Sequence, residues 1–304
     1  MGAPRNPDEV EVFLYHMFND RNIITVKSNL LRSYIAASII RNRREEARSN
    51  YQKLGGASPM VENTEKLLEK IREAYPDRHV VNIMRYTEPF AFEELKWLQL
   101  KGVEAITVIP LYPHYSTTTT KSSLEDLYLN LDKARFAPEM HIVTRFYRNE
   151  RYNRALIARI REQLGEDRAE DFDLIFSAHS LPQKIIDNGD PYQKEIEAHV
   201  ALLKEMLQQE GIRFRDVHLA YQSKLGPVKW LEPSLEEKLH SLRNRRVIVS
   251  PISFTLDNSE TDFELDIEYR EVAETLGYEA YRVAKCPNDM PLFVEALREM
   301  IDRC

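Results

Sequence analysis

Short apolar runs alternate along this chain with longer amphipathic segments, and this alternation constrains the fold more than any other feature. The apolar runs have the length and composition of buried strands and cover 79–84, 105–111, 141–146, 173–176, 217–220, 246–250 and 279–283. Helical spacing of apolar residues marks 11–18, 28–40, 62–74, 151–163, 191–209 and 291–303. Strands that alternate with helices form parallel sheets with crossover connections. We therefore predict an α/β protein with doubly wound parallel sheets.

The order of the predicted elements occurs twice along the chain. Three predicted strands precede residue 150 and four follow the charged segment 166–171. We predict two domains, 1–150 and 151–304, the second of which includes a final helix over 291–303. The first half begins almost directly with a helix, whereas a doubly wound domain ordinarily begins with a strand. The N-terminal domain is therefore expected to lack its first strand.

Composition excludes several classes of function. A net charge of −7 disfavours nucleic-acid binding, which needs a basic surface. The chain has neither a dinucleotide fingerprint nor a P-loop, and neither a nucleophile elbow nor a zinc-protease motif. Its two cysteines, Cys286 and Cys304, cannot form a disulfide framework or a four-thiolate iron–sulfur cluster. Since no signal core and no apolar span of about 18 residues occurs, a cytoplasmic protein is expected.

Polar and aromatic side chains follow five of the predicted strands directly. They occupy 85–89, 112–120, 177–182, 221–227 and 251–260. In open parallel sheets, ligands bind at the carboxyl ends of the strands. Loops are commonly polar, but aromatic residues in five such loops favour a ligand site. We predict a site at this edge of the sheets.

His179 follows the apolar run 174–176, which places it at a predicted strand end. A histidine in that position is often only a hydrogen-bonded core residue. The functional alternative is a neutral imidazole that accepts protons or ligates a metal, since its ordinary pKa is about 6.5.

A row of carboxylates forms the second candidate. Asp257, Glu260, Glu264 and Glu268 are spaced three, four and four residues apart, so a helix would place them on one stripe. Such stripes are commonly solvated surfaces, and Asp257 with Glu260 has the spacing of an N-terminal capping box. Repulsion along the row would be relieved by a weakly held divalent cation such as Fe²⁺, for which oxygen ligands are suitable.

Several blocks of the chain resemble the ferrochelatase family in sequence and in order. The first is Phe176-Ser-Ala-His179-Ser-Leu-Pro182, which is followed by Gly189-Asp-Pro-Tyr192. The others are 221–233 and 251–269 and, in the N-terminal half, Tyr51 with 55–59, Arg85-Tyr86 and 112–119. The resemblance covers nearly the whole chain, and so many blocks in one order are highly specific.

This resemblance implies a class II chelatase with two Rossmann-like domains and an active-site cleft between them. It implies insertion of Fe²⁺ into protoporphyrin IX to give haem, with two protons released. His179 and Glu260 would face each other across the macrocycle as catalytic residues and metal ligands, and Asp257, Glu264 and Glu268 would line the metal's entry path. The porphyrin would contact Met1, Tyr51, Ser58, Arg85, Tyr86, Tyr115, Ser116, Lys224 and Trp230. Fe²⁺ is then a substrate, and no permanently bound cofactor or iron–sulfur cluster is expected.

Two departures from the family's pattern matter. Asn258 stands where many members have histidine, which leaves Glu260 as the main metal-side group. Members usually begin with a strand that ends in Asn-Met-Gly-Gly-Pro, whereas this sequence begins Met1-Gly-Ala-Pro4. Our hypothesis is a start codon assigned too late or a shortened product.

Three other functions stay open at this point. The substrate could be the tetracarboxylate coproporphyrin instead of protoporphyrin. A cobalt or nickel chelatase for earlier tetrapyrroles is disfavoured by Asn258 and by the total of eight histidines. A porphyrin or haem carrier without catalytic activity would use the same cleft.

One predicted helix has an apolar face beside basic residues. The face consists of Leu30, Leu31, Tyr34, Ile35, Ile39 and Ile40, and Arg32, Arg41, Arg43 and Arg44 lie next to it. The pattern favours a buried helix with a basic end. The alternative is a lip that touches an anionic membrane, which would place the protein peripherally at the inner face of the membrane.

Overall fold

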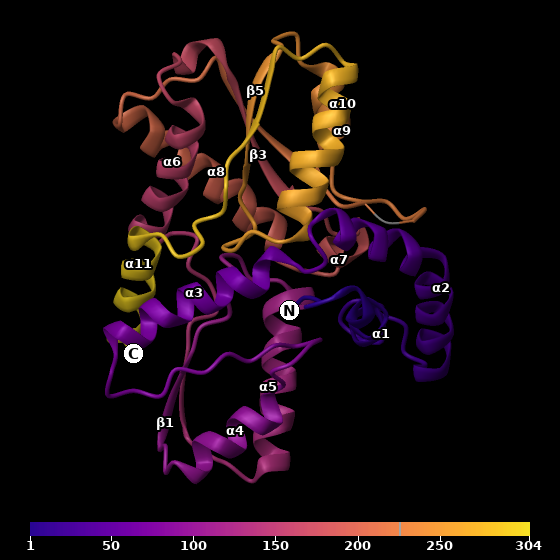
Figure 1. The fold of residues 1–304 in the computed structure, drawn as a ribbon, viewed down its shortest axis with the longest axis vertical. Helices are drawn as coiled ribbons and strands as arrows, with labels where there is room; N and C mark the ends of the chain where they lie inside the picture. The colour runs from indigo at the N-terminus through magenta and orange to yellow at the C-terminus, as the bar shows by residue number, and fades with distance from the viewer. Residues whose placement is uncertain (225) are drawn as a thin grey trace. The chain divides into compact units, whose positions relative to one another are not determined.

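The structure, a computed structural model, describes residues 1–224 and 226–304 and contains two parallel β-sheets with helices around them (Figure 1). The predicted α/β class is thereby confirmed. Contacts divide the chain into two compact units. Unit 1 comprises Met1–Pro110, Ser116–Thr144 and Arg298–Cys304, and unit 2 comprises Leu111–Tyr115 and Arg145–Leu297. A domain boundary at residue 150 stays a prediction.

Unit 1 is mostly helical and contains a two-stranded parallel sheet in its described residues. Its helices are η1 (Pro7–Glu9), α1 (Val10–Phe18), α2 (Asn29–Lys53), α3 (Pro59–Ala74), α4 (Ala91–Leu100), η2 (Thr117–Lys121) and α5 (Ser122–Ala134). Its strands are β1 (Ala105–Val108) and β2 (Glu139–Ile142), which pair in parallel from Ala105↔Glu139 to Val108↔Ile142. Leu95 and Leu98 of α4 pack on Leu127 and Leu131 of α5 and form the core beside this sheet.

The prediction of a strand over 79–84 is wrong. This segment makes one isolated bridge, between Met84 and Phe90, and no ladder. Its apolar residues Val81 and Ile83 still pack against the α4–α5 core, which explains the apolar run. Burial alone does not make a strand, because a strand also needs a neighbouring backbone to pair with. Residues 1–104, all of which are described, contain helices and no strand.

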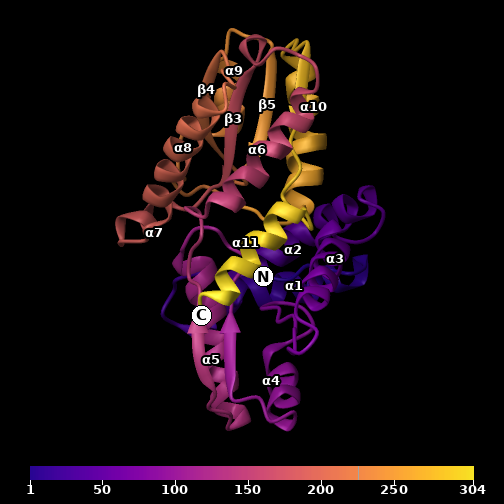
Figure 2. The ribbon, with the colours of Figure 1, turned by 90° about the vertical axis from the view of Figure 1, so that its left-hand side faces the viewer.

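Unit 2 is built on a four-stranded parallel sheet. Its strands are β3 (Asp173–His179), β4 (Asp216–Gln222), β5 (Arg246–Pro251) and β6 (Ala280–Val283), in the order β4-β3-β5-β6. β4, β3 and β5 run side by side in the same direction (Figure 2). Because the chain passes from β3 to β4 on one side and then to β5 on the other, the winding changes direction between β3 and β5. Ligands of doubly wound folds bind at such a switch point.

Helices cover both faces of the unit 2 sheet. The helices of unit 2 are α6 (Glu150–Leu164), η3 (Ala169–Asp171), α7 (Gln183–Asp187), α8 (Tyr192–Gln209), α9 (Leu235–Ser241), η4 (Glu260–Glu268), α10 (Tyr269–Thr275) and α11 (Pro291–Asp302), the last of which ends in unit 1. α6 and α8 lie on one face, whereas α9 and α10 lie on the other (Figure 1). Apolar residues of β3 point to both faces, so the strand is buried almost to its end. None of the helices in the described part of the chain is long and apolar enough to cross a bilayer.

Candidate active site

His179 lies at the carboxyl end of β3, next to the switch point of the unit 2 sheet. Its backbone N–H donates to Ser253 Oγ at 2.9 Å, and its carbonyl oxygen accepts from the Tyr192 hydroxyl at 2.9 Å. These two bonds hold the strand end. Its side-chain Nδ1 lies 2.7 Å from Glu260 Oε2. The resemblance places these side chains on opposite sides of a macrocycle; here they are in direct contact within unit 2.

The His179–Glu260 pair is open to solvent as well as to the protein interior. The exposed fractions of the two side chains are 36% and 33%. A ligand or metal ion could therefore reach both groups without unfolding of the strand end. Phe254 adds an apolar wall, because its ring meets the His179 ring edge-on with centroids 6.4 Å apart.

Glu260 begins η4, whose hydrogen bonds are those of a π-helix. The predicted capping box is wrong, because the Asp257 carboxylate accepts instead from the Cys286 N–H at 2.9 Å and from Asn288 Nδ2 at 2.7 Å. Asp257 is buried there. The Asn258 side-chain oxygen accepts from the Glu260 N–H at 2.8 Å and so gives this N–H of the first helical turn a hydrogen-bond partner. Asn258 thus has a structural role beside the pair.

Ser223 joins the pair to the next carboxylate of the row. Its N–H donates to Glu264 Oε1 at 2.7 Å, and its hydroxyl contacts both Glu264 Oε2 and, at 3.1 Å, Glu260 Oε2. Sequence reasoning missed this residue. The signal that could have found it is its position, directly after β4, whose last residue Gln222 pairs with His179.

Burial and charge shift the pKa values of these groups in opposite directions. Burial acts to lower the pKa of His179, but the charge and hydrogen bond of Glu260 together with the charge of Glu264 outweigh it, so the pKa is raised. Burial acts to raise the pKa of Glu260, but His179 and Ser223 outweigh it, so the pKa is lowered. Burial, and then the charge of Glu260, raises the pKa of Glu264 to about 7. The directions of the first two shifts favour an imidazolium–carboxylate pair, and the carboxyl group of Glu264 beside it has a pKa of about 7.

Arg85 and Tyr86, predicted to bind the porphyrin, lie in a network of unit 1. The Arg85 guanidinium lies 3.1 Å from the buried Asp20 carboxylate and 3.4 Å from that of Asp126. The buried Tyr86 hydroxyl donates to Asp20 at 2.8 Å, and Ser122 contacts the same carboxylate. Arg85 is therefore neutralised internally, and these contacts would have to open before it could bind a propionate.

Four other predicted porphyrin contacts of this half serve local structure. Ser58 caps α3 by accepting from the Met60 N–H at 3.3 Å, and Ser116 caps η2 by accepting from the Thr118 N–H at 3.1 Å. Tyr51 is buried in α2. The carbonyl oxygen of Met1 accepts from the backbone N–H groups of residues 85 and 86, at 3.1 and 2.8 Å. Contact of these four residues with a porphyrin therefore stays a prediction.

Three predicted contacts lie in unit 2 with the His179–Glu260 pair. The Tyr115 N–H donates to the Glu195 carboxylate at 2.8 Å, which fixes the loop 111–115 on unit 2. Lys224 is exposed and lies 3.7 Å from the Glu237 carboxylate. Trp230 is half-buried and forms an isolated bridge with Pro182, three residues after His179. Trp230 thus lies beside the segment that follows His179 in the chain.

A buried histidine pair, which the sequence did not indicate, anchors the same loop. His114 Nε2 lies 2.9 Å from His199 Nδ1, and His199 Nε2 lies 2.7 Å from Asn153 Oδ1. Asn153 donates its amide to the Tyr147 carbonyl, so its oxygen must accept and each histidine must donate from Nε2. His114 Nδ1 is then a buried acceptor without a hydrogen-bond partner among the described residues. Burial lowers the pKa of both rings, that of His199 to about 3.

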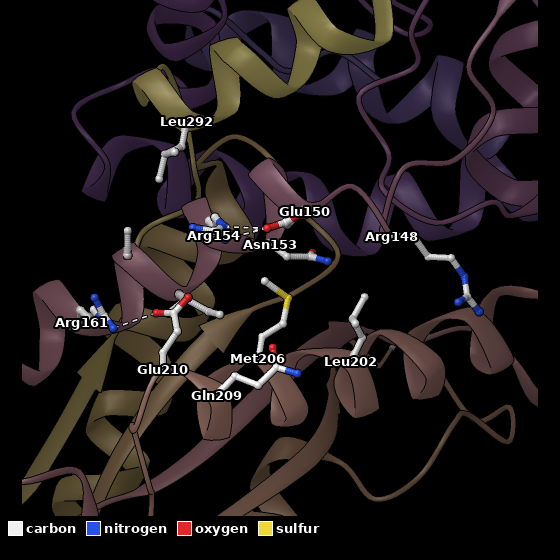
Figure 3. Close-up of a pocket in the computed structure, with 12 residues that line it drawn as sticks. Arg148, Glu150, Asn153, Arg154, Arg161, Leu202, Met206, Gln209, Glu210 and Leu292 are labelled. Carbon is white, nitrogen blue, oxygen red and sulfur yellow. Dashed lines mark hydrogen bonds and ion pairs between the residues drawn. The ribbon is translucent and has the colours of Figure 1, made fainter. Parts of the chain in front are cut away.

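A cavity of about 830 Å³ opens between α6 and α8 (Figure 3). Its lining combines apolar residues, among them Ile157, Leu202 and Met206, with charged ones. Two of its arginines are paired, Arg154 with Glu150 at 2.6 Å and Arg161 with Glu210 at 2.7 Å. The predicted site residues do not line this cavity, so it is separate from the His179–Glu260 site.

The chain's fold is that of the class II chelatases. The structure is similar to SirB from Bacillus subtilis with Fe³⁺, with a TM-score of 0.58 at 14% identity over 80% of this chain and 88% of that chain. It is also similar to CbiX, the terminal enzyme for biosynthesis of sirohaem in denitrifying bacteria, with a TM-score of 0.53 at 15% identity over 78% and 89%. At these identities the likeness shows the fold alone.

Sequence comparison defines the family. The family model for ferrochelatase matches residues 1–304. Ferrochelatases from Nitratiruptor sp. and Sulfurimonas denitrificans are 51% and 52% identical, over 100% and 98% of this chain and 97% and 94% of those proteins. The ferrochelatase of Wolinella succinogenes is 46% identical. The chain therefore belongs to the ferrochelatase family, whose members are lyases of haem biosynthesis that insert ferrous iron into a porphyrin.

Proposed function

We propose that this chain inserts Fe²⁺ into protoporphyrin IX, a dicarboxylate porphyrin, giving haem and two protons. The observation that carries the proposal is the 2.7 Å contact between His179 and Glu260 at the switch point of the unit 2 sheet. A free-base porphyrin must lose two pyrrole N–H protons before it can bind the metal, so the site needs proton acceptors next to a place for the ion. The imidazole of His179 and the carboxyl groups of Glu260 and Glu264 supply the proton acceptors and the place for the ion.

The order of events follows from the charges of the free site. The lowered pKa of Glu260 favours an ionised oxygen ligand for Fe²⁺, and the raised pKa of His179 favours its protonated form. A divalent cation bound to Glu260 weakens the attraction between this carboxylate and the imidazolium of His179. The cation also repels the imidazolium, so His179 releases its proton. The neutral imidazole can then accept a proton from a pyrrole nitrogen. Each proton can leave to solvent, because about one third of each side chain of the pair is exposed.

The metal's path would run along η4. Glu264 and Glu268 follow Glu260 at intervals of four residues on this helix, and single oxygen ligands hold Fe²⁺ weakly enough to pass it on. We leave Asp257 out of this path, because its side chain is buried and its carboxylate is bound by Cys286 and Asn288, whereas Glu264 is partly exposed. For the macrocycle, Tyr115, Lys224 and Trp230 are the proposed contacts in unit 2, and the unit 1 contacts stay a prediction.

The choice of porphyrin can be tested by comparing kcat/KM for two substrates. We expect protoporphyrin IX to exceed coproporphyrin by about tenfold or more, because two additional carboxylates that find no cationic partner lose their solvation. Anaerobic insertion of Fe²⁺ into each porphyrin measures the ratio. A higher kcat/KM for coproporphyrin would instead establish the tetracarboxylate as substrate. Binding of both without insertion would indicate a carrier.

The helix predicted to be buried is exposed at its N-terminal end. Leu30 and Tyr34 of α2 are 87% and 75% exposed, and Leu31 of α2 and Val12 and Tyr15 of α1 are at least half exposed. The prediction of burial is wrong for Leu30, Leu31 and Tyr34, although Ile40 is buried. Exposed apolar groups beside arginines are typical of surfaces that touch an anionic bilayer. We also propose that this surface makes a peripheral contact with the inner face of the membrane.

Vesicle binding tests the membrane contact. We expect wild-type protein to co-sediment with phosphatidylglycerol vesicles and Leu30→Ser/Tyr34→Ser protein to bind about tenfold less, because two partly inserted side chains are lost. Leu100→Ser/Tyr128→Ser is the matched control, since these side chains are 84% and 50% exposed elsewhere on unit 1. Equal binding of the two double variants, or no binding of the wild type, would reject the contact.

A further inference from the structure

Ser223 has a backbone conformation that serine rarely adopts. Its φ is +65°, in the left-handed region that favours glycine. It stands directly after β4, and the ladder between β3 and β4 ends one residue earlier, at His179↔Gln222. A side chain other than glycine in this region costs free energy, and such costs are concentrated at functional sites. The contacts of Ser223 show what the conformation achieves.

Because the ladder ends before Ser223, its N–H is released from strand pairing and donates to Glu264 Oε1 at 2.7 Å. Its hydroxyl lies 3.1 Å from Glu260 Oε2, the same oxygen that contacts His179. The hydroxyl also contacts the second oxygen of Glu264. Ser223 therefore contacts both carboxyl groups: its N–H donates to Glu264, and its hydroxyl, which has one proton to donate, lies within hydrogen-bond distance of an oxygen of each.

The Glu260 carboxylate has few contacts that hold it in this position. Carboxylates four residues apart on a helix repel one another, and Glu260 is one-third exposed and could turn toward solvent. Its N–H already takes part in the first turn through Asn258, which fixes the backbone but not the carboxylate. In the described part of the chain, the side-chain hydrogen bonds of Glu260 come from His179 and Ser223.

We propose that Ser223 is a positioning residue for iron insertion. Its hydroxyl aims the Glu260 carboxylate at His179, and its N–H keeps Glu264 beside them on the path of the metal. The inference rests on the proposed function of the His179–Glu260 pair. It also predicts that the hydroxyl, more than the backbone conformation, carries the effect on the reaction.

Two substitutions separate the hydroxyl from the backbone. Ser223→Gly removes the hydroxyl and suits a φ of +65°, whereas Ser223→Ala removes the hydroxyl and keeps the strain. We expect both to lower kcat/KM for Fe²⁺ by about tenfold to a hundredfold, the effect of one hydrogen bond to a charged group. The dissociation constant for protoporphyrin, measured by fluorescence quenching, should stay within about twofold. Ser241→Ala, which removes an exposed hydroxyl bonded to the Lys238 carbonyl, is the matched control.

The other outcomes reject different parts of the proposal. Wild-type insertion with unchanged kcat/KM for Fe²⁺ in both variants would reject the role of Ser223 and leave the proposed function intact. A loss in Ser223→Ala alone would show that the hydroxyl matters by holding the left-handed backbone, which glycine adopts without it, and would reject the direct role of the hydroxyl in aiming Glu260. An equal loss of porphyrin binding would indicate general disruption of the site. If one variant fails to fold, the other still decides. No insertion by the wild type would reject the proposed function itself.

Discussion

Replacing Glu260 by Gln is expected to lower the rate of iron insertion by about a hundredfold to ten-thousandfold, the usual range for loss of a positioned acid–base group. Gln keeps the length of the side chain and an oxygen that can accept from His179 Nδ1. It removes the charge that attracts Fe²⁺ and that raises the pKa of His179. Porphyrin binding should change by less than about twofold, because the change leaves the site's shape intact.

The comparison needs both rates and affinities. Anaerobic insertion rates and the dissociation constant for protoporphyrin would be measured for the wild type, Glu260→Gln and Glu271→Gln. Glu271 is the matched control because it is an exposed glutamate on α10, the helix that continues η4. Wild-type rates in Glu260→Gln would show that the reaction centre lies elsewhere. A slow Glu271→Gln would show that general loss of negative charge explains the effect.

The buried histidine pair is expected to make unit 2 sensitive to acid. His114 and His199 stay neutral in the folded state because burial lowers the pKa of each. In the unfolded chain they bind protons below pH about 6.5. Since the unfolded state then binds more protons, the free energy of unfolding falls as pH falls from about 6.5, by up to about 1.4 kcal/mol per pH unit for each histidine. Between pH 6.5 and 5 each contributes a loss of about 2 kcal/mol.

Urea unfolding at pH 7, 6 and 5 measures this loss. We expect the double variant His114→Gln/His199→Gln to be less stable than the wild type at pH 7, since a buried network is disturbed. Its free energy of unfolding should nevertheless depend less on pH over this range. His240→Gln is the control, because His240 is exposed at the end of α9. Parallel pH dependences of the double variant and the wild type would contradict the assignment.

The strands of unit 2 could be predicted from sequence more fully than the elements of unit 1. The runs 173–176, 217–220, 246–250 and 279–283 all lie within or overlap β3 to β6, because a strand buried on both faces is apolar throughout. The run 79–84 has the same composition but no partner strand. α2 continues to Lys53, beyond the predicted end at 40, because its charged second half has no apolar period to indicate a helix. The local pattern of apolar residues indicates that a segment is buried, whereas strand pairing depends on which segment of the chain lies beside it.

The same limit applies to the site. His179 and Glu260 could be proposed because each stands in a distinctive local context, a strand end and a carboxylate row. The part played by Ser223 depends on contacts with residues about 40 positions away. Likewise, Arg85 is neutralised by Asp20, far from it in sequence, and Asp257 is bound by the loop at Asn288. Such contacts follow from the fold, and the spacing of the residues gives no sign of them.

The reaction that we propose for this chain converts protoporphyrin IX and Fe²⁺ into haem. Anaerobic mixing of the pure protein with both substrates, followed at the Soret band and with a pH indicator in weak buffer, tests it most directly. We expect the free-base spectrum to be replaced by that of haem, with two protons released for each porphyrin converted. A porphyrin that binds while its free-base spectrum persists, with no proton release, would contradict it.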